Sequence, residues 1–428
     1  MDYVAPDALR RQLARLSRQD LVERLQAVRA LSASRGLRYL DDRSRPKTID
    51  LALVPWLLTP AQMVFFRGVV QTLAAALRRL PALYVQHRAV REILPLDPEQ
   101  ESWIGLAAHP RSRPLAVVGR LDSTATFAHA RWRETFQMLE PNAVGVGGVH
   151  YAPTACSIVL DVLGDVLARA FPGRTILPTP DPRQLLREEL TRVASRLGRR
   201  LRRLALIENT DYTTGTDEFG SLARDFTRQG LATIVTDPRH VRLRSGRLVA
   251  QGVEIDLLYR DCELSEFIEI EEAGHRLNGM RRAVREGRLV SGLMWEFDQK
   301  SAWELFTDPG WARHFTPAQR RLFRTHLPWT RLVRDIRTTD PRGRPTDLLA
   351  YIRRHKDALV LKPNTLYGGQ GVVMGHTVTQ PVWERTLARG LRRGEDRHVV
   401  QQIAPIAQHA FPVLEGLRPR RVERCVVP

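Results

Sequence analysis

Cysteine is rare in this sequence. Only three cysteines, Cys156, Cys262 and Cys425, occur in 428 residues, and no two of them form a CxxC pair. Their odd number and wide separation indicate neither a disulfide framework nor a zinc site. A chain with free cysteines suits a reducing compartment, so we expect a cytoplasmic protein.

Long apolar runs are also missing. The most apolar region, residues 49–85, is interrupted by Pro55, Pro60 and Arg67, so it does not supply the ~20 residues of a membrane span. Residues 1–36 are charged throughout and lack the apolar core of a secretory signal. The content of 43% hydrophobic residues still favours a folded chain, and 428 residues favour two or three lobes. We therefore expect no membrane association.

Lysine is scarce although the chain is strongly basic. The sequence has 66 basic residues and a formal net charge of +19, but its only lysines are Lys47, Lys300, Lys356 and Lys362. In so arginine-biased a chain, a lysine can mark a crowded phosphate site where a compact ammonium fits and a planar guanidinium does not. Lys47 and Lys356 have the sequence surroundings of ordinary surface residues.

The positive charge is not accompanied by a nucleic-acid recognition motif. Basic residues are spread along the chain, with one dense cluster at residues 196–203. The sequence shows no recognition helix, zinc finger or RNP-like aromatic pair. A basic surface that attracts nucleotides or another anionic partner is the favoured interpretation, and binding of DNA or RNA is the less favoured alternative.

The most informative stretch follows residue 357. Residues 358–361 are a short apolar run typical of a buried strand, Lys362 comes next, and residues 372–374 resume an apolar strand. The glycines between the two strands are Gly368, Gly369 and Gly371. Glycines allow positive φ, and the N–H groups of such a loop can bind an anion, so this segment suits nucleotide phosphates. It is neither a Walker loop nor a Rossmann fingerprint. A glycine-rich hairpin with a surface lysine remains the alternative.

A second group of polar residues lies in the N-terminal third. Residues 115–121 are expected to form a strand that leads to Arg120 and Asp122 at its end. Glu140 and Asn142 lie two residues apart and therefore share one face of an extended segment. The oxygen atoms of the two acids and the amide suit Mg²⁺, which prefers one or two carboxylates together with substrate phosphates. An Arg120–Asp122 ion pair followed by a Glu-Pro-Asn turn is the alternative.

Hydrophobic periodicity predicts most other elements. Helices are expected over residues 8–31, 59–80, 155–171, 181–201, 267–286, 348–355 and 381–391. The alternation of strands and helices over residues 204–259 indicates a small sheet covered by helices.

Other features concern individual positions. Arg260 and Asp261 follow the last of these strands, either as cleft residues or as an ion pair. A strand is expected over residues 290–297, and Asp298 is expected to cap the next helix. The strand at residues 398–403 carries Gln401 and Gln402, which could hydrogen-bond an adenine edge. Beyond Pro405 the chain is expected to be irregular.

Four blocks of the sequence, taken in chain order, resemble motifs of the circularly permuted ATP-grasp proteins. This group includes the glutathionylspermidine synthetase-like amide ligases. The blocks are Arg120-Leu121-Asp122, Glu140-Pro141-Asn142, Asp298-Gln299-Lys300-Ser301-Ala302, and Leu361-Lys362-Pro363 with Tyr367-Gly368-Gly369-Gln370-Gly371, followed by Gln401-Gln402. In the permuted group the metal motifs precede the lysine-bearing strands, as they do here. The blocks span residues 115–403, and no single one is specific.

The resemblance implies an α/β (α+β) fold of the circularly permuted ATP-grasp type with a helical N-terminal region. The implied segments are a helical region over residues 1–110, a metal-ligand segment over 111–180, a small α/β domain over 181–290, and a lysine and glycine-loop region over 291–428. It also implies ATP and Mg²⁺, activation of a carboxylate as an acyl phosphate, and attack by an amine. The partners would be a small-molecule or peptide carboxylate and an amine.

The family's roles carry over to individual positions. Lys300 and Lys362 would hold ATP phosphates, and Arg120 would steady the γ-phosphate and the acyl phosphate. The glycines that would close as a lid are Gly368, Gly369 and Gly371. The residues that would hold Mg²⁺ are Asp122, Glu140 and Asn142. This is phosphoryl transfer by positioning and electrostatics.

The sequence departs from the family pattern at two places. The chain ends soon after Gln402, so further strands and an arginine are expected to be missing, supplied by residues 418–424, or provided by a partner chain. The pair Arg260-Asp261 has no counterpart in the pattern. A nucleotide-binding protein without ligase activity is therefore an alternative to an active ligase, and the sequence does not name the substrates or the oligomer.

Overall fold

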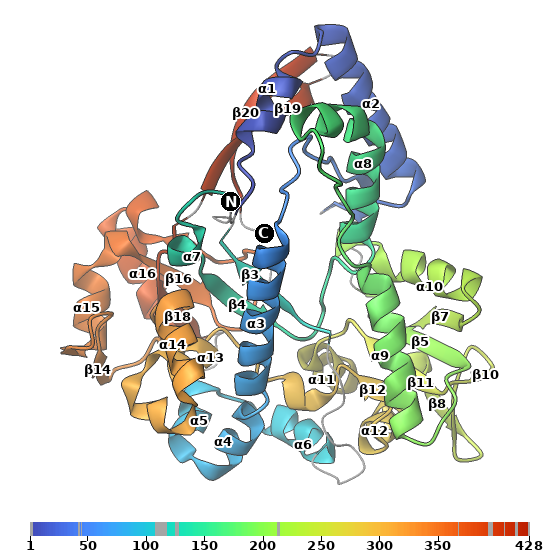
Figure 1. The fold of residues 1–428 in the computed structure, drawn as a ribbon. Coiled ribbons are helices and arrows are strands. Elements are labelled where there is room, and N and C mark those ends of the chain that lie inside the picture. The colour runs from blue at the N-terminus through green and yellow to red at the C-terminus, as the bar shows by residue number, and fades with distance from the viewer. Residues whose placement is uncertain are drawn as a thin grey trace.

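The computed structural model divides into one upper and two lower lobes around a central helix (Figure 1). The described residues are 3–41, 43, 45–107, 118–124, 128–211, 215–366, 368–392, 397–405, 407–415 and 418–426. Helices and strands are interspersed through them, which confirms the predicted α/β class. Residues 115–117 of an expected strand, Tyr367 of the glycine block and the arginine side chains of residues 418–424 lie outside the description.

The upper lobe joins the start of the chain to a helix from its middle and a hairpin from its end (Figure 1). Its helices are α1 (Asp7–Leu13), α2 (Arg18–Ser34) and α8 (Tyr151–Ala170), and its hairpin strands are β19 (Ala407–Glu415) and β20 (Arg418–Val426). A short sheet has the order β2 (Pro46–Thr48), β1 (Arg38–Leu40), β6 (Gly215–Thr216). Leu25 and Val28 of α2 share an apolar cluster with Ile158 and Leu163 of α8. The amphipathic helices expected at residues 8–31 are confirmed.

Helix α8 is the one helix in the described part of the chain whose length and apolar composition would allow it to cross a membrane. Core helices of soluble proteins pass the same test, and α8 packs against α1 and α2. This finding is weak evidence for a membrane span.

The lower right lobe is built on a parallel sheet with the order β12-β11-β5-β7. Its strands are β5 (Arg203–Ile207), β7 (Ala232–Thr236), β11 (Leu257–Arg260) and β12 (Leu289–Val290), and its helices are α9 (Pro182–Arg196), α10 (Glu218–Arg228), α11 (Leu264–Glu272) and α12 (Asn278–Arg285). A small antiparallel sheet contains β8 (Arg242–Arg244), β9 (Arg247–Ala250) and β10 (Val253–Glu254).

Apolar residues cover both faces of this parallel sheet. Leu204 and Leu206 cluster with α9 and α10, whereas Ala205 and Ile207 belong to the central core. Such two-sided burial explains why these strands read as continuous apolar runs. From β5 the chain first adds β7 on one side of β5 and later adds β11 on the opposite side of β5. A topological switch point therefore lies between β5 and β11.

The lower left lobe contains an antiparallel sheet with the order β13-β18-β16-β17. Its strands are β13 (Thr330–Leu332), β16 (Leu359–Pro363), β17 (Val373–Met374) and β18 (His398–Gln402), and the same lobe has the hairpin β14 (Arg337–Thr339) and β15 (Pro345–Asp347) with helices α15 (Leu348–Arg354) and α16 (Gln380–Gly390). Leu359 and Leu361 of β16 are buried with Trp383 and Leu387 of α16. The buried strand expected before Lys362 is therefore confirmed.

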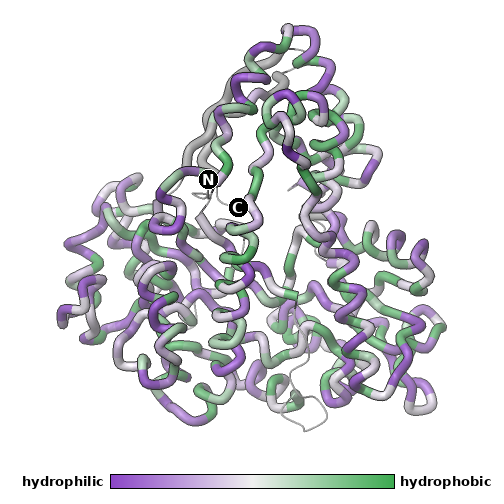
Figure 2. The backbone as a smooth tube through the Cα atoms, in the orientation of Figure 1, coloured by the Kyte–Doolittle hydropathy of each residue, from purple (hydrophilic) through white to green (hydrophobic). Residues whose placement is uncertain are grey.

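Helix α3 (Pro60–Leu77) and a ribbon of two strands lie between the lobes (Figure 1). The ribbon strands are β3 (Arg120–Ser123) and β4 (Met138–Asn142), and the neighbouring helices are α4 (Leu80–Gln86), α5 (Arg88–Ile93), α6 (Pro98–Ala107), α7 (Trp132–Thr135), α13 (Ala302–Thr307) and α14 (Pro317–His326). Thr59 caps α3, because its hydroxyl accepts a 3.2 Å hydrogen bond from the Gln62 amide. Hydrophilic residues follow the outer turns of the lower lobes (Figure 2).

Several predicted elements are wrong. The helix expected over residues 267–286 is interrupted at Gly274, whose φ of +91° follows the end of α11. The strand expected over 290–297 stops after β12, and a 3-10 turn then buries Leu293 and Trp295 in the core. Asp298 does not cap α13; its carboxylate accepts a hydrogen bond of 2.6 Å from the Ala143 amide. The chain beyond Pro405 is not irregular, since it forms the β19–β20 hairpin.

The apolar clusters can be compared with the four segments that the sequence predicts. The helices of residues 1–110 divide between two clusters, because α1 and α2 pack with α8 whereas α3 to α6 contribute to the central core. The parallel sheet and the antiparallel sheet each have a cluster of their own. The four segment boundaries stay a prediction.

Candidate functional site

The ribbon β3–β4 brings four predicted site residues onto one face. In its antiparallel register Arg120 is opposite Asn142, and Asp122 is opposite Glu140. Because side chains alternate between the two faces of a strand, residues two apart on each strand share a face. The spacing in the sequence thus predicted the grouping within each strand, but the pairing of the two strands is seen only in the fold.

The Arg120–Asp122 ion pair that the sequence left open is formed. The Nε atom of Arg120 lies 2.6 Å from Oδ1 of Asp122, and Nη2 lies 3.2 Å from Oδ2. A third nitrogen, Nη1, donates a hydrogen bond of 3.3 Å to the Gly147 carbonyl. The hydrogen bond to Asp122 raises the pKa of the Arg120 guanidinium. The charge is therefore held in place at the ribbon, with about half of the side chain exposed.

The two lysines of interest face this ribbon from the left lobe. The Nζ atom of Lys300 lies 3.5 Å from Oε2 of Glu140 and donates a 2.6 Å hydrogen bond to the Leu366 carbonyl. Lys362 lies within β16, one residue before its end, and not beyond the strand as the sequence suggested. Burial lowers the pKa of the Lys362 ammonium; the charges of Glu140 and Asp122 oppose this shift, and Lys300 adds to it.

Gln401 connects Lys362 to the ribbon. Its Oε1 atom accepts a hydrogen bond of 2.9 Å from Lys362 Nζ, and its Nε2 atom donates to the Leu139 carbonyl at 3.1 Å and to Thr330 Oγ1 at 3.0 Å. Gln401 is 1% exposed. Both amide hydrogens are therefore used within the protein and none is left for the predicted adenine contact, whereas Gln402 is exposed.

Two residues that the sequence analysis missed hold the lysine segments together. The side-chain oxygen of Asn364 accepts a 2.9 Å hydrogen bond from the Ser301 amide, and its nitrogen donates to Gln299 Oε1 at 2.9 Å. The Lys300 amide in turn donates to the Asn364 carbonyl at 3.2 Å. Gln299 lies in a quoted block directly before Lys300, and Asn364 lies two residues after Lys362, just outside the quoted blocks. Proximity to a lysine was the available signal.

The glycine loop has the predicted backbone geometry. Gly368, Gly369 and Gly371 have φ values of +64°, +75° and +68°. A side chain at Gly371 would place its Cβ 2.7 Å from Cγ of Pro363, whereas no atom lies within 4 Å of a Cβ at Gly368 or Gly369. The loop therefore packs closely at one end and is open at the other.

These residues surround a cavity of about 290 Å³. The predicted site residues that line it are Asp122, Glu140, Lys300, Lys362, Gly369, Gln401 and Gln402. Apolar side chains, among them Val360 and Met374, complete the wall. Arg120 and Asn142 line a second cavity of about 1070 Å³ at the end of the ribbon. An apolar wall with a few convergent charged groups is typical of a small-ligand site.

The donor set of the ribbon fits a magnesium ion that also takes ligands from phosphates. No group of three or more His, Cys, Asp or Glu side chains within the described residues could hold a metal. Asp122 and Glu140 supply two opposed carboxylates, and Asn142 supplies an amide oxygen. Mg²⁺ is commonly held by one or two carboxylates plus substrate phosphates, so this small set is sufficient.

A second concentration of charge lies where the parallel strands end. Glu208 follows β5 and Asp261 follows β11, on the two sides of the switch point. Burial raises the pKa of Glu208 to about 7, and the charge of Asp261 adds to the shift. Burial likewise raises the pKa of Glu263 to about 8 and that of Asp298 to about 7, with a contribution from Glu296 in both cases.

Arg260 is directed away from Asp261, so it does not form the ion pair considered from the sequence. Its guanidinium bonds the Glu296 carboxylate and donates to the carbonyls of Ser291 at 2.7 Å and Cys262 at 2.9 Å. The residue is 1% exposed. Arg260 therefore joins β11 to the segment after β12.

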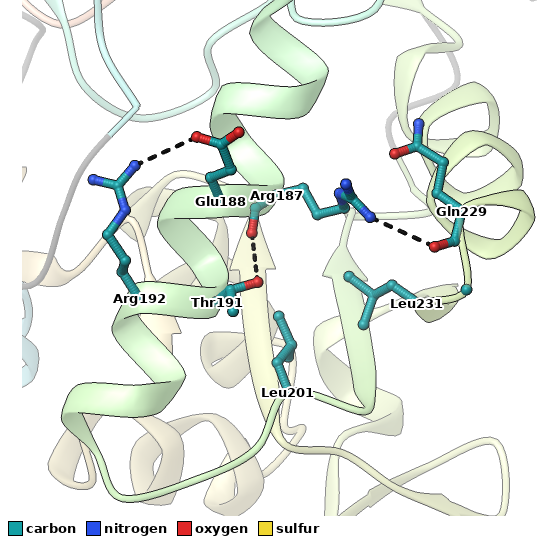
Figure 3. A pocket seen from close by; sticks show the side chains of 8 residues that line it. Arg187, Glu188, Thr191, Arg192, Leu201, Gln229 and Leu231 are labelled. Atoms are coloured by element: carbon teal, nitrogen blue, oxygen red, sulfur yellow. Dashed lines mark hydrogen bonds and ion pairs between the residues drawn. The ribbon is translucent and has the colours of Figure 1, made fainter.

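A further cavity, of about 510 Å³, lies beside helix α9 (Figure 3). Its polar groups mainly bond one another. Arg187 donates to the Gln229 carbonyl at 3.5 Å, Thr191 donates to the Arg187 carbonyl at 2.8 Å, and Arg192 lies 3.8 Å from Glu188. We assign no chemistry to this cavity.

Comparison with solved structures shows a likeness in fold. No protein-family model matches the chain, and no curated protein matches it. Its fold is similar to that of a glutathione synthetase-like effector from Globodera pallida in the apo form, with a TM-score of 0.64 and 12% identity over 97% of this chain and 88% of that chain. At this identity the likeness concerns the fold alone, which is glutathione synthetase-like. Membership of the permuted ATP-grasp group remains an interpretation of the sequence.

Proposed function

We propose that this protein is an ATP- and Mg²⁺-dependent ligase of the permuted ATP-grasp type, which joins a carboxylate to an amine through an acyl phosphate. The proposal rests mainly on one observation. Lys300 and Lys362, two of only four lysines, line one cavity together with Asp122 and Glu140. The glutathione synthetase-like fold supports it.

Each charged group has a role in this reaction. Lys300 and Lys362 bind the phosphates of ATP, and Gln401 keeps the Lys362 ammonium directed into the cavity. Asp122, Glu140 and Asn142 hold Mg²⁺, which neutralises phosphate charge when bound. In the absence of ligands, Arg120 and Lys300 serve as counter-ions of the two carboxylates. Binding of nucleotide and metal exchanges these internal pairs for pairs with the ligand.

The chemistry consists of two displacements. A carboxylate oxygen of the acid attacks the γ-phosphorus of ATP, the bond to the β–γ bridging oxygen breaks, and ADP leaves. The amine then attacks the carbonyl carbon of the acyl phosphate, inorganic phosphate leaves, and the amine gives up a proton. Arg120 stabilises the charge on the transferred phosphoryl group. Catalysis arises from positioning and fixed charge, with no covalent step on the protein.

The glycine loop supplies the cover over the phosphates. The space around Gly368 and Gly369 allows the tip of the loop to approach a ligand, while the close contact of Gly371 with Pro363 fixes its base. A lid of this kind excludes water from an acyl phosphate that would otherwise hydrolyse.

The first test compares lysines by thermal unfolding with ATP and Mg²⁺. Ligand binding to the folded state raises the wild-type midpoint by mass action. Lys362→Ala should weaken ATP binding roughly 10- to 100-fold, as expected for loss of a charged hydrogen-bond donor. The control is Lys47→Ala, which removes an exposed lysine on β2 and should bind as the wild type does.

The second arm separates a ligase from a protein that only binds nucleotide. Glu140→Gln keeps the shape of the side chain, so it should retain most of the ATP-dependent shift. It should reduce ADP release in the presence of acids and amines on the order of 10²-fold. A wild type that shows no shift with millimolar ATP–Mg²⁺, or equal ATP affinity in all three variants, would contradict the site assignment.

A further inference from the structure

Beyond the nucleotide cavity, a long cleft runs from the end of the ribbon along helices α3 and α4. It consists of the cavity of about 1070 Å³ and a neighbouring one of about 420 Å³. Arg78 and Trp295 line both cavities, so the two are adjacent. One end of the cleft is at Arg120 and Asn142, and the other is at Val85.

One wall of this cleft is mainly apolar and is formed by α3, α4 and the connection between them. The residues of α3 and α4 and their connection that line it are Val70, Gln71, Ala74, Leu77, Arg78, Pro81, Ala82, Val85 and Gln86. Within each helix these residues recur every three or four positions, as expected for one face of that helix. Val70 and Val85 are 48% and 73% exposed, and Leu185 on the opposite wall is 51% exposed. These apolar surfaces would be covered by a ligand that lies along the cleft.

The charge of the cleft selects an acid rather than an amine. The arginines that line it are Arg78, Arg120, Arg192 and Arg196, and Glu189 is the one acidic residue among the described lining. Arg192 is paired with Glu189 at 2.6 Å, and Arg120 is paired with Asp122. The excess positive charge attracts carboxylates and repels protonated amines.

The inner end of the cleft has a hydrogen-bond donor without a partner. The Nδ2 atom of Asn142 is buried, and no acceptor among the described residues bonds to it. A buried donor of this kind costs free energy unless a ligand satisfies it. Asn142 and Arg120 share the ribbon face of Asp122 and Glu140, which line the nucleotide cavity. A carboxylate at this end would therefore lie beside the phosphates of bound ATP.

We propose that this cleft binds the acid substrate, and that the acid has one carboxylate at Arg120 and Asn142 and an elongated apolar body along α3, Trp295 and α4. This inference rests on the proposed ligase function, because it assigns the substrate that the ligase activates. The apolar body gives affinity through burial, and the arginines orient the carboxylate towards the ribbon.

The test measures binding of decanoate to the full chain by titration calorimetry, with decylamine and succinate as comparison ligands. Decanoate should bind, decylamine should bind at least tenfold more weakly because of its charge, and succinate should bind weakly because it lacks an apolar body. Val85→Glu should reduce decanoate affinity roughly tenfold. The control is Val64→Glu, since Val64 is 70% exposed on the preceding helix, α3, and lines neither cavity.

ATP–Mg²⁺ binding is measured on the same samples, so that the two proposals can fail separately. If ATP binds and decanoate does not, the acid assignment is wrong and the ligase proposal stands. A second outcome is that decanoate binds, that Val85→Glu lowers its affinity, and that ATP–Mg²⁺ binds to none of the samples. In that case the cleft is a binding site and the ligase proposal is wrong. Equal decanoate affinity in Val85→Glu and Val64→Glu, or tighter binding of decylamine, would overturn the cleft assignment.

Discussion

The two sheets of the lower lobes concentrate charge in opposite ways. At the antiparallel sheet, opposite charges meet: Lys300 lies near Glu140, Arg120 bonds Asp122, and Lys362 donates to a neutral amide. At the end of the parallel sheet, half-buried carboxylates such as Glu208 and Glu263 have raised pKa values, and other acidic residues add to each shift.

This difference separates a site whose paired charges can accept a charged ligand from a region where several acidic residues lie close to a single arginine, Arg260. Arg120, Asp122 and their neighbours Lys300 and Glu140 can exchange partners when ATP and Mg²⁺ bind, because each of these four has a counter-ion before binding. Carboxylates that are partly buried among other acidic residues instead take up protons, since burial and like charges disfavour the charged form. The antiparallel sheet should therefore respond to nucleotide, and the parallel sheet should respond to pH.

The largest expected effect concerns pH and the parallel sheet. The folded-state pKa values of Glu208, Glu263 and Asp298 lie at about 7, 8 and 7, above the usual values of 4.5 for Glu and 3.8 for Asp. The folded state thus keeps protons that the unfolded chain releases. Their stabilising contribution is complete below pH ~4 and is lost as pH rises through the folded-state values, at roughly pH 7 to 8.

Urea denaturation between pH 5 and pH 9 measures this effect. The free energy of unfolding should fall across the range, by about 1.4 kcal/mol at most for each unit by which a folded-state pKa exceeds its unfolded value. Glu263→Gln removes one such group and should make the decline shallower. Glu99→Gln, at an exposed carboxylate of α6, is the control and should leave the slope unchanged. Stability that rises with pH in this interval would contradict the comparison.

The next effect concerns the buried amide of the antiparallel sheet. Gln401→Leu leaves the Lys362 ammonium, the Thr330 hydroxyl and the Leu139 carbonyl without their shared partner. The loss of stability should be about 1–3 kcal/mol, since a buried charged donor is left without its acceptor. The measurement is urea denaturation at one pH, with ATP binding as a second observable.

Gln402→Leu provides the control for this prediction. Gln402 is the next residue of the same strand and is exposed, so the change should alter stability by less than about 0.5 kcal/mol. If the two variants are equally stable, Gln401 does not position Lys362 in the way that its hydrogen bonds suggest.

The sequence predicted the polar motifs better than the surfaces around them. Alternation along the strands grouped Glu140 with Asn142, and the scarcity of lysine singled out Lys300 and Lys362. The apolar run at residues 290–297 was misleading, because short apolar runs do not distinguish a strand from a buried turn. The hairpin β19–β20 was missed since it contains Pro412 and Pro419 and many arginines, which weaken a strand pattern.

The cleft along α3 could not be predicted from local sequence. Val70, Leu77 and Arg78 have the composition of any amphipathic helix, and nothing in their spacing indicates that they face a space rather than a neighbour. That space exists because α9, the ribbon and the turn with Trp295 approach α3 from distant parts of the chain. Chemical motifs are local in sequence, whereas the shape of a substrate site depends on long-range packing.

The smallest expected effect tests the glycine loop of the antiparallel sheet. Gly371→Ala combines a left-handed φ of +68° with a Cβ placed 2.7 Å from Cγ of Pro363. Gly369→Ala has the conformational cost alone, because no atom lies within 4 Å of its Cβ. That shared cost is about 1–2 kcal/mol, and the contact should add to it at Gly371. Urea denaturation of the two variants gives the difference. For ATP affinity, Gly369→Ala is the more informative of the two variants. It stiffens the open end of the loop and leaves the base of the loop in place. Equal losses of stability would mean that the contact with Pro363 does not fix the base of the loop.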